Sequence, residues 1–248
     1  MIESEKFVRK GSGWPKRLST AREAVRFIEA AGFCLLFPAK NVPLPSLYFA
    51  AERRWPPVWD EMAKRLWRWK DELPRKRRAF YAKYFKGRGT FISLEFLPHF
   101  LAMRDSAAAP GDSGWFYDEG RITAGARAIW EAIAKEGPLA TLELRQICKM
   151  GGKAGNARFK KAALELQCLL ILAHFGAEQE TQAWASNRFE LISRAFPEQV
   201  REARRISAKQ ARACLARKYR SLYPASTAIQ VARLFGWPKT LAEEALCE

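Results

Sequence analysis

The sequence has few of the residues that build metal sites and disulfide frameworks. It contains two histidines, His99 and His174, and five widely separated cysteines without a Cys-x-x-Cys pair. Structural zinc sites need four such ligands at short spacing, and disulfide scaffolds need paired cysteines. Long apolar runs are also missing, and residues 1–10 lack the apolar stretch of a signal peptide. We therefore expect no metal site, no export, no membrane span, and a reducing, cytoplasmic (nucleoid-associated) setting.

Recognisable catalytic motifs are missing as well. The sequence has no glycine-rich phosphate loop and no Gly-x-Ser-x-Gly, and we expect no cofactor. Two adjacent residues, Lys70 and Asp71, are weak catalytic candidates, because an amine beside a carboxylate among aromatic residues can act as a nucleophile. The competing interpretation is an ordinary surface ion cluster, which is the more common outcome for such a pair.

Positive charge is abundant. Lysine and arginine number 43 against 26 acidic residues, which gives a net charge of +17 and a pI near 10.0. Self-repulsion of this size opposes folding, and a polyanionic partner is the usual reason to retain it. We expect the partner to be nucleic acid, with duplex DNA first and RNA as an alternative. A generic basic surface is the competing explanation, and the oligomeric state is left open.

Composition divides the chain into segments. With 48% hydrophobic residues the chain can bury a core, and a stretch rich in alanine, proline and glycine at 107–114 reads as a linker. The predicted fold class is mainly α with short β-hairpins, built from tandem winged-helix or helix-turn-helix modules. The predicted segments are a flexible basic arm (1–17), a helical, winged-helix-like domain rich in tryptophan and basic residues (18–106), a central winged-helix domain (115–200) and a C-terminal partial helix-turn-helix (201–248).

The central domain carries the clearest pattern. Three short apolar-periodic helices follow one another from residue 122, and the third begins at Asn156. Two β-prone runs, 170–175 and 183–189, then flank a polar turn. This is the winged-helix order, in which the third helix normally enters the major groove. The turn carries Glu178 and Glu180 but no cation, so we do not expect this wing to grip the minor groove.

Two groups of side chains are predicted to contact DNA. The third helix of the central domain offers cations for phosphates and an amide for base edges: Lys153, Asn156, Arg158, Lys160 and Lys161. The basic run after residue 64 offers further phosphate contacts: Arg68, Lys70, Arg75, Lys76, Arg77 and Arg78. Solvated helix faces are the alternative for both groups. Trp67 and Trp69 are predicted either to stack on unpaired bases or, as aromatics more often do, to pack in a core.

Several stretches resemble one family. The chain is similar to the bacterial winged-helix DNA glycosylases that unhook interstrand crosslinks, the YcaQ/AlkZ-like superfamily, and especially to their poorly characterised relatives. The matching stretches are 27–32 in the first helix, 78–81 running on to 97–98, 128–133 with 137–139, and 216–219 through 236–237. The resemblance implies a scaffold of tandem winged helices curved around duplex DNA.

The catalytic motif of that family is not found. In members that excise bases, a Gln-x-Gln motif soon after the first helix positions the attacking water. The corresponding stretch here, 33–38, has no glutamine, and no Gln-x-Gln occurs in the chain. Three functions follow as hypotheses: a DNA-binding protein acting in repair through phosphate contacts, a glycosylase for alkylated or crosslinked bases, and a transcriptional regulator.

Overall fold

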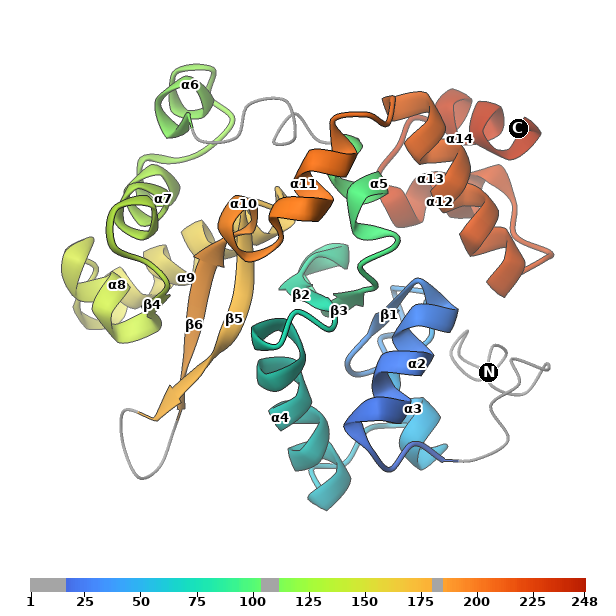
Figure 1. The fold of residues 1–248 in the computed structure, drawn as a ribbon, viewed down its shortest axis with the longest axis horizontal. Coiled ribbons are helices and arrows are strands. Elements are labelled where there is room, and N and C mark those ends of the chain that lie inside the picture. Colours follow the sequence, from blue (N-terminus) through green and yellow to red (C-terminus); the bar gives the residue numbers. More distant parts are fainter. Residues whose placement is uncertain (1–16, 104–111, 180–184) are drawn as a thin grey trace.

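The computed structural model describes residues 17–103, 112–179 and 185–248. Most of the predicted arm, most of the predicted linker and the part of the predicted wing turn from Glu180 onward lie outside these ranges. The first part of that turn, 176–179, was expected as a turn but continues strand β5 (Leu172–Gln179), where it pairs with β6 (Ala185–Leu191). The described chain is mainly helical and contains two small antiparallel sheets of three strands each (Figure 1). No helix in the described ranges has both the length and the apolar character to cross a membrane.

The first unit wraps helices around one small sheet. Its elements, in chain order, are α2 (Ala21–Ala31), β1 (Phe33–Leu35), α3 (Leu47–Glu52), α4 (Glu61–Arg75), β2 (Phe80–Lys83), the 3-10 turn η1 (Phe85–Gly87), β3 (Gly89–Ile92) and α5 (Leu97–Ala102). The strand order is β1-β3-β2, because β3 pairs antiparallel with both of the others. Nearly all side chains of the three strands are buried.

Local sequence explains how the helices of this unit begin and end. Thr20 caps α2, its hydroxyl accepting from the Glu23 N–H while the Glu23 carboxylate accepts from the Thr20 N–H. Gly32 ends α2 at φ 75°, a conformation that costs glycine least. Asp60 caps α4 by accepting from the Ala63 N–H.

The second unit repeats the order of the first. Its elements are α6 (Ser113–Asp118), α7 (Ala124–Glu136), β4 (Leu139–Ala140), α8 (Thr141–Ile147), α9 (Gly152–Cys168), β5 (Leu172–Gln179) and β6 (Ala185–Leu191). From α7 onward it runs helix, strand, two helices and hairpin, as the first unit does from α2. Its strand order, β4-β6-β5, again places the last strand between the other two.

Details of the second unit differ from the sequence expectation. The helix expected from Asn156 begins at Gly152, which brings Lys153 and Asn156 into its first two turns. Thr141 is the first residue of α8, and its hydroxyl donates to the carbonyl of Asn187, which ties α8 to β6. The two-residue strand β4 was not expected at all, because so short a pairing leaves no periodic pattern.

The C-terminal helices return to the first unit. They are α10 (Ile192–Ala195), α11 (Pro197–Ala203), α12 (Ala208–Leu222), α13 (Ala228–Phe235) and α14 (Lys239–Cys247). Figure 1 shows α10 beside β5 and β6, and α11 and α12 beside α5, with α13 and α14 farther from α7 and α8. The Phe235 ring of α13 lies 5.8 Å from that of Phe33 and 5.7 Å from that of Phe85. These helices therefore share a hydrophobic core with the first sheet.

Two cores meet at the start of the second hairpin. The second unit has its own core around Trp130, Phe159 and Leu166. Leu170 and Ala173, at the start of the hairpin, belong instead to the core of the first unit. The buried side chain of Gln167 accepts from the Lys83 N–H across the same boundary at 3.0 Å. The hairpin is thus held against α4 and β2, and this contact brings polar side chains of the hairpin next to those of α4.

Candidate functional site: an ion cluster between two units

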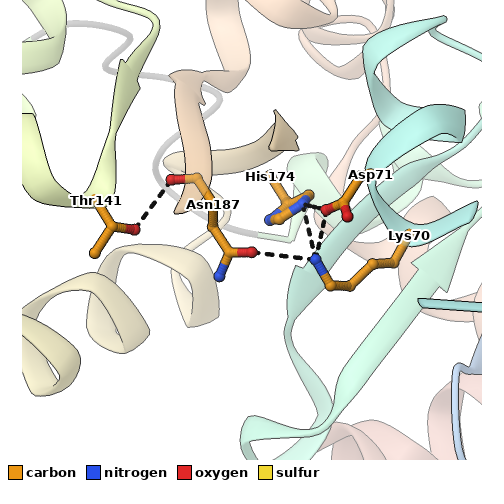
Figure 2. Close-up of polar contacts among 5 residues, drawn as sticks. All are labelled: Lys70, Asp71, Thr141, His174 and Asn187. Carbon is orange, nitrogen blue, oxygen red and sulfur yellow. Dashed lines mark hydrogen bonds and ion pairs between the residues drawn. The ribbon is translucent and has the colours of Figure 1, made fainter. Parts of the chain in front are cut away.

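Four polar side chains from three elements meet between α4 and the second hairpin (Figure 2). Lys70 Nζ lies 2.5 Å from Asp71 Oδ1 and donates to Asn187 Oδ1 at 3.1 Å. His174 Nε2 lies 2.5 Å from the same Asp71 oxygen and 3.5 Å from Lys70 Nζ. Asp71 Oδ1 is therefore the centre of the cluster, contacted by an amine from its own helix and an imidazole from β5.

Burial determines the charge states in this cluster. Lys70 and His174 are each only 2% exposed. Burial lowers the pKa of His174 to about 4, against the opposing hydrogen bond to Asp71, so the ring is neutral at pH 7. A neutral ring that donates from Nε2 to Asp71 fits the 2.5 Å contact. Burial also lowers the pKa of the Lys70 amine, which the Asp71 carboxylate only partly offsets.

The Asp71 carboxylate differs from its two neighbours because it reaches solvent. Its side chain is 21% exposed. Burial alone would raise its pKa, but the hydrogen bond from His174 and the charge of Lys70 outweigh burial and lower the pKa below its ordinary value. Within the described residues, its hydrogen bonds and ion pairs all fall on Oδ1. Oδ2 belongs to an ionised carboxylate that is held in place through its other oxygen.

Aromatic rings border the cluster on two sides. The Tyr81 ring, buried in β2, lies edge-on to His174 at 5.4 Å. On the outer side, Lys70 Nζ lies 4.6 Å from the centre of the Trp67 ring. Trp67 is 42% exposed and meets the exposed ring of Trp59 edge-on at 5.7 Å. Lys70 therefore contacts both the partly exposed Asp71 and the exposed Trp67.

The outer face of α4 is a row of cations interrupted by Asp71. Lys64, Arg68, Asp71 and Arg75 follow one another at spacings of four, three and four residues, which places them on one face of the helix. The three cations are exposed, and Arg77 and Arg78 extend the exposed positive charge beyond the end of α4. The aliphatic stem of Arg75 lies over Gly176 of β5.

A second group of exposed cations lies on α9. Lys153, Arg158, Lys160 and Lys161 are exposed and Asn156 is half-buried, while Phe159 faces the core of its unit. Among the described residues, the cations predicted to contact DNA on α4 and α9 have one surface ion pair, Lys76 with Glu72 at 2.6 Å. The remaining exposed side chains in these two groups are available to an anionic ligand.

Two of the predicted contacts lie in a different environment from the rest. Lys70 was predicted among the phosphate contacts and also as a weak catalytic candidate. Its side chain is buried and bound to Asp71 and Asn187, so it cannot reach a phosphate as the exposed cations can. Trp69 is 5% exposed and packs in the core, whereas Trp67 reaches the surface.

His174 and Asn187 were not predicted as site residues. They lie more than 100 residues from Lys70 along the chain. One signal for His174 was present, since it is a histidine inside an apolar β-run, and a buried polar side chain needs a partner. Nothing in the sequence identifies Asn187. In the described part of the chain, no group of three or more His, Cys, Asp or Glu side chains could hold a metal ion.

A comparison with known protein families identifies the family of this chain. A family model described as AlkZ related matches residues 18–236, which is most of the chain. The chain therefore belongs to the AlkZ-related family, as the resemblance had implied. No curated protein and no solved structure gave a match.

The position of the missing glutamine pair is now visible in the fold. The stretch that the resemblance assigns to it begins with β1, and Phe33, Cys34 and Leu35 are all fully buried against the first core. Apolar side chains in this environment offer no hydrogen bond to a water molecule.

Proposed function

We propose that the chain is a duplex DNA-binding protein of DNA repair that uses two winged-helix modules. One observation carries the proposal: the order helix, strand, two helices, hairpin occurs twice, each time with the last strand central in the sheet. In a winged helix the third helix enters the major groove. The third helices of the two units are α4 and α9, which bear the two groups of exposed cations. Membership of the AlkZ-related family supports the role in repair.

Phosphate contacts would supply most of the affinity. Exposed arginine and lysine side chains bind phosphates with little regard to sequence, and a net charge of +17 attracts the duplex from a distance. The second hairpin adds little positive charge, because the sequence 176–185 has no lysine or arginine and Arg188 pairs with Glu178 at 3.5 Å. This protein is accordingly a helix-based binder of low sequence specificity, with its second hairpin serving to hold the two units together.

Fluorescence anisotropy with a labelled random duplex tests this function. We expect the double variant Arg158→Ala/Lys161→Ala to bind at least about 10-fold more weakly at moderate salt, since it loses two phosphate contacts. Lys135→Ala is the matched control, because this α7 side chain is 81% exposed and lies outside both groups. Equal affinities for the double variant and the control would reject the proposal. Tighter binding to an RNA hairpin than to duplex DNA would also reject it.

A second candidate function, base excision, is favoured by a specific observation. The ion cluster contains an ionised, partly exposed carboxylate in a row of exposed cations on α4. The family resemblance implies alkylated or crosslinked bases as substrates. A transcriptional regulator would need dimer symmetry and one operator, and we found no feature that favours it.

A further inference from the structure

We propose that Trp67 and Asp71 of α4 form a base-excision site, in which Trp67 stacks on an extrahelical nucleobase and Asp71 faces its C1′ atom. The proposal rests on the DNA binding proposed above. It assigns the chemistry to side chains of α4 and not to those of β1, where the glutamine pair is missing.

Position supports the assignment. Asp71 lies between Arg68 and Arg75 on the outer face of α4, so phosphates bound by those cations would bring the sugar–phosphate backbone against its carboxylate. Trp67 is one helical turn before Asp71, and residues four apart on a helix are neighbours. Lys70 Nζ contacts both of them, at 4.6 Å from the Trp67 ring and 2.5 Å from Asp71 Oδ1. An exposed tryptophan offers a face on which any base can stack.

The carboxylate is arranged to act on a cationic sugar. Lys70 and His174 both bind Oδ1, so they fix the orientation of Asp71 and keep it ionised, and no contact within the described residues engages Oδ2. A fixed negative charge stabilises positive charge that develops in a transition state. Lys70 and His174 do not reach the substrate in this scheme and are positioning residues.

The reaction that follows balances without a cofactor. The C1′–N bond breaks and its electron pair leaves with the base, so positive charge develops at C1′ opposite Asp71. The oxygen of a water molecule then bonds to C1′ and its proton passes to the carboxylate and on to solvent. The products are the free base and an abasic deoxyribose. No group in the cluster is placed to protonate the leaving base, since Lys70 is ion-paired and His174 is neutral; the site suits bases that already carry positive charge.

Single-turnover excision by the full chain tests the proposal, with duplexes carrying one 7-methylguanine or one 3-methyladenine as probes. We expect wild type to release a base and Asp71→Asn to release it at least about 100-fold more slowly. The variant should bind undamaged duplex at least as tightly as wild type, because it removes a negative charge from the row of cations on α4. Glu72→Gln is the matched control, because it removes a neighbouring carboxylate that only pairs with Lys76 on the surface. Trp67→Ala should slow release about 10-fold through lost stacking, whereas Trp115→Ala, an exposed tryptophan of α6, should not.

The outcomes separate this proposal from the function it rests on. Wild type that binds duplex but releases neither base overturns the excision site and leaves DNA binding intact, whereas failure to bind overturns the proposed function. Excision by Asp71→Asn at the wild-type rate also overturns the assignment. A covalent protein–DNA complex trapped by borohydride would also overturn the assignment, because it would show that an amine of the protein, and not water, attacks C1′. Because Trp67 is exposed, its variant remains informative even if Asp71→Asn does not fold.

The positioning role of His174 has its own readout. Removing its hydrogen bond in His174→Phe should raise the pKa of Asp71 and move the acid limb of the pH–rate profile to higher pH. His174→Gln keeps a donor and should restore the wild-type profile. Identical profiles for wild type and His174→Phe would overturn the assignment of His174.

Discussion

His174 should make the stability of the folded chain fall between pH 6.5 and pH 4. The ordinary pKa of 6.5 applies to the unfolded chain, whereas burial lowers the pKa in the folded chain to about 4. Over this interval the unfolded chain binds a proton that the folded chain excludes, so protonation favours unfolding as the pH decreases. By pH 4.5 the loss from this one residue should be about 2 to 3 kcal/mol relative to pH 7.5. Asp71 titrates below this window in both states, because its ordinary pKa is 3.8 and the fold lowers it further.

Urea denaturation at pH 7.5 and pH 4.5 measures this loss. His174→Gln removes the titrating group and keeps a donor for Asp71, so its free energy of unfolding should decrease by about 2 kcal/mol less than that of wild type. The chain offers a matched control in its only other histidine. His99 is half-buried, and burial lowers its pKa in the same direction. His99→Gln should therefore recover a smaller part of the stability that wild type loses between pH 7.5 and pH 4.5. The reasoning fails if His174→Gln loses as much stability as wild type between the two pH values.

Two further substitutions test the packing around the site. Lys70→Met leaves the partly exposed Asp71 carboxylate without its buried cation and should lower the free energy of unfolding at pH 7 by about 1 to 3 kcal/mol. An unchanged free energy of unfolding would mean that the ion pair is not buried as described. Gly155→Ala places a Cβ 2.6 Å from the backbone oxygen of Met150 and should cost about 1 to 3 kcal/mol in the same urea assay. Gly151→Ala, where a Cβ meets nothing within 4 Å, is its control, and equal stability of the two variants would contradict the close contact.

Much of the helical structure could be predicted from local signals. Thr20, Glu23 and Gly32 mark both ends of α2, and the apolar spacing of 208–246 predicts three helices close to α12, α13 and α14. The first hairpin, β2 with β3, has no comparable local signal. Its strands are buried on both faces and lack the alternation that identifies a half-exposed strand.

Two of the four residues in the ion cluster could be identified from the sequence. Lys70 and Asp71 are neighbours and were considered together as a nucleophile and a carboxylate. The structure changes their roles, because His174 and Asn187 arrive from a hairpin that packs on α4 only in the folded chain. Contacts between residues so far apart in the chain produce no motif of fixed spacing that the sequence could show. The tandem repetition of two units was predicted as a fold class, but the shared strand order becomes visible only once the strands are paired.

The salt dependence of duplex binding tests the central claim most directly, that exposed cations of α4 and α9 bind phosphates of one duplex. Each neutralised phosphate contributes about 0.9 to the slope of log Kobs against log salt. Wild type should give a slope of about −4 or steeper with a random duplex, and Arg68→Ala and Arg158→Ala should each reduce its size by about 1. A slope near zero, or one that neither variant changes, would contradict the account.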